Sequence, residues 1–264
     1  MSEPVHPPEG GAGETPNAPS ASVDVPRARK AFIPLECNPE VMTALVHKLG
    51  LSKSLAFHDV FSISDPDLLA FVPRPALALL LVFPVSESYQ RHRIAEDAGK
   101  EEYSKRGDGE DPVWFKQTIK NACGMIGVLH AVCNGGSRDM IGDGSSLQEL
   151  LSKALPLPPL ERAKALEDSQ ELASAHKSAA TRGASAVPDA EADVDLHYVC
   201  FVKAKDNHLY ELDGQRKGPL DRGDLGDDDV LSERAVNVVQ IFIDREKESG
   251  RLDFSLVTLA PNMD

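Results

Sequence analysis

The chain has 264 residues and a net charge of −14, from 42 acidic and 28 basic side chains. This length fits one large domain or two ordinary ones, and we expect one domain after a tail. The acidic balance repels phosphate backbones and anionic lipid surfaces, so it argues against nucleic acid and membranes as partners and favours a basic protein surface. The longest apolar run, residues 76–85, is far shorter than the roughly 20 residues of a membrane helix.

The first 30 residues are rich in Pro, Gly, Ser and Glu and almost lack large apolar side chains. Such a composition cannot offset the entropy cost of folding, so residues 1–30 are predicted to be a disordered tail. They also lack the basic and apolar segments of a secretory signal. We therefore expect a soluble protein of the cytoplasm, with the nucleus as a second location.

Strand and helix patterns alternate along the folded part. Residues 32–35 are predicted to form a short strand. Asn38 and Pro39 then start a helix that Gly50 closes. Beyond it the pattern predicts two strands, in residues 57–63 and 76–83. A polar helix is predicted in residues 86–105 and an apolar helix in residues 122–134. A further helix with a capping box is predicted from Ser146 onward.

The last third of the chain begins with residues 174–193, which are small, polar and turn-rich and predict a long exposed loop. The sequence DLHYVCFVKAKDNHLYELDG, residues 195–214, predicts a β-hairpin that turns near Lys205. An amphipathic helix and a final strand follow, around residues 231–242 and 251–260.

Two of the four cysteines lie in the sequence FKQTIKNACGMIGVLHAVCN, residues 115–134. No Cys-x-x-Cys pair is present, which indicates reduced thiols rather than a disulfide framework or a zinc site. Cys123 would lie in the first turn of its helix, where free backbone N–H groups and the helix dipole favour a thiolate. It is the candidate nucleophile, whereas Cys133 falls on the apolar face and is interpreted as a buried structural thiol.

His197 is the candidate base among eight histidines. With the hairpin centred on Lys205, His197 and Asp213 are directly opposed, with Cβ atoms about 4.5–5.5 Å apart, so the aspartate could orient the imidazole. Gln117 either contributes an N–H to an oxyanion site together with the Cys123 backbone or is a solvated glutamine, and the spacing leaves both open. The order Gln, Cys, His, Asp favours nucleophilic catalysis.

These segments resemble those of the ubiquitin C-terminal hydrolases, peptidase family C12, in their short single-domain form. Residues 115–134 resemble the family's active-site segment and residues 195–214 its His and Asp segment, within a resemblance over about residues 31–260. It implies a papain-like α/β (α+β) fold over residues 31–264, with a mainly antiparallel central sheet flanked by helices and a knotted backbone. The resemblance implies that Cys123 is the nucleophile and His197 the general base and later acid. It implies that Asp213 is the orienting carboxylate and Gln117 the oxyanion donor.

The resemblance also implies a substrate and a partner. It implies a deubiquitinating enzyme that cleaves amide, ester or thioester adducts after the C-terminal glycine of ubiquitin, through an acyl-enzyme on Cys123. The enzyme is expected to be a monomer and to need no metal or organic cofactor. The turn-rich residues 174–193 occupy the place of the family's crossover loop, which limits the leaving group. Five residues match or lie beside positions of the family's ubiquitin-contacting surface: Leu35, Glu36, Asn38, Glu40 and Asp59. Without the resemblance, the sequence is equally consistent with ordinary surface residues at these positions.

Three alternatives remain at this point. The first is a ubiquitin-binding or storage protein without turnover, and the second is the same chemistry directed at Nedd8. A papain-type endopeptidase is weaker, because the chain lacks the secretory context of such enzymes. Met125, where the family commonly has a small hydroxyl residue, either reshapes the pocket or merely packs.

Overall fold

The computed structural model describes residues 1, 30–183, 187–247, 250–251 and 253–263. The predicted tail therefore lies almost wholly outside the described residues. No helix among the described residues is long and apolar enough to cross a membrane. Within the same ranges, no group of three or more His, Cys, Asp or Glu side chains is placed to hold a metal ion.

A six-stranded sheet forms the centre of the domain, and all of its strand pairs are antiparallel. The order across the sheet is β1-β6-β2-β3-β4-β5, so strands from both ends of the domain meet in it. Its strands are β1 (Leu55–Asp59), β2 (Ala78–Pro84), β3 (Leu196–Lys203), β4 (His208–Leu212), β5 (Leu220–Asp224) and β6 (Ser255–Pro261). The predicted antiparallel sheet is confirmed, whereas the knotted path stays a prediction.

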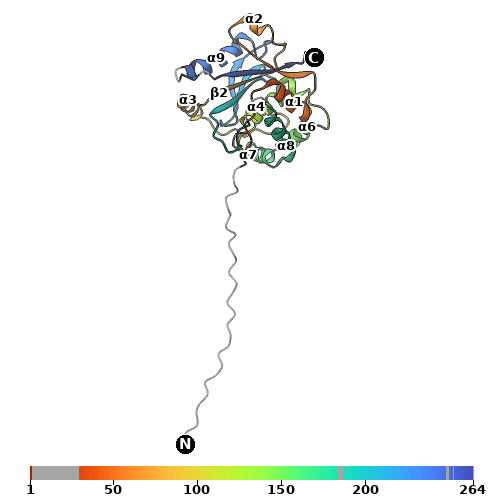
Figure 1. The fold of residues 1–264 in the computed structure, drawn as a ribbon, viewed down its shortest axis with the longest axis vertical. Coiled ribbons are helices and arrows are strands. Elements are labelled where there is room, and N and C mark those ends of the chain that lie inside the picture. The colour runs from red at the N-terminus through yellow and green to blue at the C-terminus, as the bar shows by residue number, and fades with distance from the viewer. Residues whose placement is uncertain (2–29, 184–186, 248–249, 252, 264) are drawn as a thin grey trace.

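Helices cover both faces of this sheet (Figure 1). They are α1 (Pro39–Leu49), α2 (Pro66–Leu69), α3 (Glu87–Asp97), α4 (Cys123–Val132), α5 (Gly135–Arg138), α6 (Ser146–Ala154), α7 (Pro159–Asp168), α8 (Gln170–Ala180) and α9 (Glu233–Lys247). All seven residues of β2 are buried, because alternate side chains enter two different cores. Leu80 belongs to the core that contains α1 and α4, and Leu79 to the core under α9.

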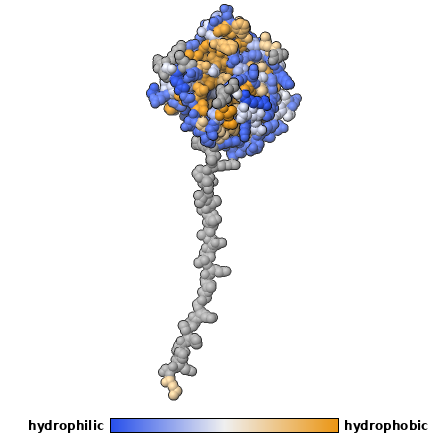
Figure 2. Space-filling model, in the orientation of Figure 1, coloured by the Kyte–Doolittle hydropathy of each residue, from blue (hydrophilic) through white to orange (hydrophobic). Residues whose placement is uncertain are grey.

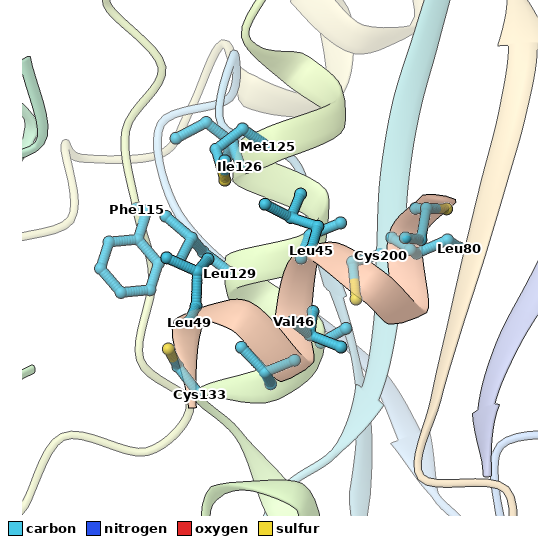
Figure 3. Close-up of a cluster of buried hydrophobic side chains, with 14 of the residues drawn as sticks. Leu45, Val46, Leu49, Leu80, Phe115, Met125, Ile126, Leu129, Cys133 and Cys200 are labelled. Carbon is cyan, nitrogen blue, oxygen red and sulfur yellow. The ribbon is translucent and has the colours of Figure 1, made fainter. Parts of the chain in front are cut away.

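Helix α4 runs through the larger core and is buried along its whole length after Cys123 (Figure 3). Side chains of α1, β2 and β3 surround it, which is why its sequence is apolar on every side. Cys133 has no exposed surface, as predicted for a structural thiol. Met125 is 1% exposed and belongs to the same core, so it packs rather than shaping a pocket.

Several predicted boundaries are wrong. Residues 32–35 form no strand, because the chain makes one bridge, between Ala31 and Lys120, and Pro34 then has no N–H for a ladder. The N-cap of α6 is Ser145, whose hydroxyl accepts from the Gln148 N–H, and not Ser146. Helix α8 continues to Ala180 because one of its faces packs on α1, so the loop predicted from residue 174 begins only after this helix.

Candidate active site

Cys123 is the first residue of α4 and lines a cleft of about 360 Å³. A second cysteine, Cys37, lines the same cleft. Burial, followed by the nearby Asp59 and Glu36 charges, raises the pKa of Cys37 to about 12 despite a hydrogen bond with Tyr198. Cys37 therefore stays a protonated thiol at neutral pH, which leaves Cys123 as the candidate nucleophile in this cleft.

The backbone before Cys123 is held by the loop that leads into β3. Asn121 has a positive φ of 58°. Its side-chain amide donates to the carbonyls of Ala190 and Ala192 at 2.9 and 2.8 Å. Lys120 donates to the carbonyl of Glu191 at 2.7 Å. The segment that presents the nucleophile and the loop over the cleft are therefore bonded directly to each other.

His197 and Asp213 form a buried hydrogen-bonded pair, with 2.8 Å between His197 Nε2 and Asp213 Oδ1. Because Nε2 is bonded to Asp213, Nδ1 is the ring nitrogen left for the Cys123 sulfur, which lies close enough to affect the pKa of His197. Burial by itself lowers the pKa of His197. The Asp213 carboxylate and Cys123 outweigh burial and raise this pKa to about 10, so the imidazole is protonated at neutral pH.

The predicted register of the hairpin is wrong by two residues, although the pair it suggested does form. In the structure Cys200 pairs with Leu212 and Phe201 with Glu211, so His197 and Asp213 are diagonal rather than directly opposed. A shift of two residues keeps both side chains on the same face of the hairpin. A shift of one residue would have placed them on opposite faces.

Asp213 is fully buried immediately after β4. Burial alone would raise its pKa, but the His197 imidazolium, followed by hydrogen bonds from the Gln215 N–H and the Tyr89 hydroxyl, holds this pKa well below its usual range. The Trp114 indole donates to the Asp213 carbonyl at 3.1 Å. The carboxylate is therefore ionised and fixed, which is the state that can orient an imidazole.

Gln117 lies beside the turn that follows Asp213. Its backbone N–H donates to the Gly214 carbonyl at 2.9 Å, and a Cβ on Gly214 would lie 2.9 Å from both Gln117 Cβ and Ile126 Cγ2. Only glycine allows this approach of the turn to α4. The Gln117 side chain donates to the Ile119 carbonyl at 3.2 Å, which uses one of its two amide N–H groups.

A family model described as "Ubiquitin carboxyl-terminal hydrolase, family 1" matches residues 32–244. The chain belongs to this family. It is the C12 family of cysteine peptidases, so the expected enzyme class, a ubiquitinyl hydrolase, is confirmed at the level of the family.

Relatives cover nearly the whole chain. A probable ubiquitin carboxyl-terminal hydrolase of Dictyostelium discoideum is 36% identical over 92% of this chain and 94% of its own length. Ubiquitin carboxyl-terminal hydrolase YUH1 of Saccharomyces cerevisiae is 34% identical over 88% of this chain and 97% of its own length. The catalytic domain of Trichinella spiralis UCH37, solved with ubiquitin vinyl methyl ester, has a TM-score of 0.69 at 22% identity over 89% and 98% of the two chains. The similarity to the UCH37 catalytic domain supports the assignment of the fold.

The five residues assigned to a ubiquitin-contacting surface of this hydrolase do not share one groove. Leu35 and Glu36 line the cleft with Cys123, and Asp59 lies close to Cys37. Asn38 instead caps α1, accepting from the Glu40 and Val41 N–H groups. Glu40 lines a separate hollow beside α1. Contact with ubiquitin stays a prediction for all five.

Sequence reasoning missed the groups that surround Asp213. Tyr89 donates to its carboxylate and Gln215 lies 3.5 Å from His197 Nδ1, but both contacts join segments that are remote in sequence or depend on the turn geometry. One signal was present for Tyr89, since it is the only phenol in a mostly polar helix. Such a residue commonly has a buried, hydrogen-bonded hydroxyl.

Substitution of Gln117 by alanine is expected to lower kcat by about 10²- to 10³-fold with a small change in KM, because an oxyanion donor acts mainly in the transition state. The measurement is steady-state hydrolysis of an amide at the C-terminus of ubiquitin. Gln148→Ala, which removes a glutamine that bonds Asp143 outside the site, is the matched control. Equal kcat values for the two variants would exclude Gln117 from the oxyanion site.

Proposed function

We propose that this protein hydrolyses adducts at the C-terminal glycine of ubiquitin through an acyl-enzyme on Cys123. The observation that carries the proposal is the placement of Cys123 at the start of a buried helix, close to an imidazole that Asp213 orients. This is the arrangement of a nucleophile, its base and the group that orients the base. Family membership supports the same chemistry.

The reaction follows from the site in two halves. The Cys123 thiolate attacks the glycine carbonyl, and the second N–H of Gln117 and the Cys123 backbone N–H stabilise the oxyanion. His197 gives its proton to the leaving amine, alcohol or thiol, and the C–N, C–O or C–S bond breaks to leave a thioester. Neutral His197 then takes a proton from water, and the hydroxide attacks the thioester. The C–S bond to Cys123 breaks, which restores the thiolate and releases ubiquitin with a free carboxylate.

Ubiquitin fits the charge of this chain. The C-terminal tail of ubiquitin carries arginines before its last two glycines, and the chain has a net charge of −14 with Glu36 at the cleft. The face in Figure 2 also carries apolar surface over α2 and down its middle, and Phe61 and Phe71 are 75% and 78% exposed. An exposed apolar surface of this kind is typical of a protein-binding site.

Hydrolysis of a fluorogenic amide on ubiquitin, with the Nedd8 equivalent in parallel, tests this proposal. We expect turnover of the ubiquitin amide with the higher kcat/KM. A higher kcat/KM for Nedd8 would reassign the substrate but keep the chemistry. Tight binding of ubiquitin by the folded protein without turnover would support the storage alternative and contradict the proposed reaction.

The loop between α8 and β3 is proposed to limit the size of the leaving group. Val187, Pro188 and Val194 line the cleft that contains Cys123, and Lys120 and Asn121 hold the same loop. A chain lacking residues 182–193 is expected to release folded proteins from ubiquitin faster than the complete chain, while turnover of the small fluorogenic amide changes little. Gel assays with both substrates measure this, and an unchanged size limit would reject the role.

A further inference from the structure

Both oxygens of the Asp213 carboxylate are hydrogen-bonded, and the donor on Oδ2 has no part in the proposed reaction. Oδ1 lies 2.8 Å from His197 Nε2 and accepts from the Gln215 N–H at 2.8 Å. Oδ2 accepts from the Tyr89 hydroxyl at 2.8 Å. Because a carboxylate rotates easily about its last torsion, a donor on Oδ2 fixes the direction in which Oδ1 points.

Tyr89 is itself held rigidly. Its side chain is 1% exposed, and its ring meets Phe83 edge to face with 4.7 Å between the centroids. Burial, followed by the Asp213 charge, raises the pKa of Tyr89 far above its ordinary value. The hydroxyl therefore remains a donor over the whole working range of pH.

The helix that carries Tyr89 is attached to the Asp213 turn at a second point. Tyr89 and Asp97 are the two buried residues of the polar helix α3. Asp97 pairs with Arg216 at 3.1 Å, and the Arg216 backbone N–H donates to the Asp213 carbonyl at 3.1 Å. The position of the hydroxyl is thus fixed relative to the carboxylate from both ends of α3.

We propose that Tyr89 is a positioning residue for the His197–Asp213 pair. Its hydroxyl holds the carboxylate with Oδ1 toward His197, so that the imidazole keeps Nε2 on Asp213 and leaves Nδ1 for Cys123. Without the hydroxyl, Oδ2 is buried and unbonded, the carboxylate can turn, and the imidazolium loses its fixed orientation. The consequence for turnover rests on the proposed function, whereas the consequence for His197 does not.

Tyr89→Phe tests this role, because it removes the hydroxyl and keeps the ring that packs on Phe83. We expect kcat for the ubiquitin amide to fall roughly 10- to 100-fold with KM nearly unchanged. A fall of this size corresponds to the loss of one hydrogen bond to a charged group. The pKa of His197, followed by NMR on the free protein, should fall toward its ordinary value. Tyr210→Phe is the matched control, since Tyr210 also donates to an aspartate, Asp206 at 2.8 Å, outside the site.

The two readouts separate this inference from the proposed function. Failure of the wild-type protein to turn over ubiquitin amide would overturn the proposed function, while the NMR titration would still judge the role of Tyr89. A folded Tyr89→Phe variant with the wild-type His197 titration would overturn the positioning role, whatever its kcat. In an Asp213→Ala background, Tyr89→Phe should cost no further activity, and multiplicative losses would also overturn it.

Discussion

Replacement of Cys123 by alanine is expected to lower turnover of a ubiquitin C-terminal amide by about 10⁴-fold or more, because no acyl-enzyme can then form. Binding of ubiquitin should persist, since the thiol is a small part of the cleft surface. Steady-state hydrolysis measures the first effect and fluorescence anisotropy of labelled ubiquitin the second. The combination separates a lost nucleophile from a lost fold.

Cys37→Ala is the matched control for this experiment. Cys37 lines the same cleft, but its raised pKa keeps it a neutral thiol, so the variant should retain turnover that a thiol-alkylating reagent abolishes. If Cys37→Ala lost activity and Cys123→Ala kept it, the assignment of the nucleophile would be wrong.

The second large effect is expected for stability rather than for chemistry. Arg162 and Glu110 form a bidentate ion pair with no exposed side-chain surface, and Arg162 also donates to the Trp114 carbonyl at 2.7 Å. Arg162→Met leaves the Glu110 carboxylate buried without its cation, which should lower the free energy of unfolding by about 3–5 kcal/mol. Urea denaturation followed by circular dichroism measures the change.

Two further variants locate the cause of that loss. Lys164→Met on the same helix removes an exposed ion pair with Asp168 and should leave stability nearly unchanged. Adding Glu110→Gln to Arg162→Met should recover part of the loss, because the uncompensated charge is then gone. A stability loss in Arg162→Met no larger than in Lys164→Met would contradict the account of the ion pair.

Local signals predicted some elements because the groups that decide them are neighbours in sequence. The Asn38 side chain accepts from the Glu40 and Val41 N–H groups, and Gly50 closes α1 with a φ of 108°. Both contacts span a few residues, so composition and spacing identify them. The apolar sequence likewise predicts the helix over residues 122–134, and α4 begins at Cys123, within the first predicted turn.

Contacts between distant segments could not be predicted in the same way. The Tyr89 hydroxyl is 124 positions from Asp213, and Arg162 is 52 positions from Glu110. Helix α8 was assigned partly to a loop because its small residues become a packing face only against α1. The role proposed for Gln117 depended on the family resemblance, because spacing alone left two interpretations of this residue open.

Mass spectrometry of the protein after reaction with ubiquitin vinyl methyl ester tests the central claim most directly, because it reports both recognition of ubiquitin and the residue that attacks its C-terminus. We predict a single covalent adduct, one ubiquitin per chain, on the peptide that contains Cys123. Absence of an adduct on the folded protein, or an adduct on Cys37 instead, would contradict the account.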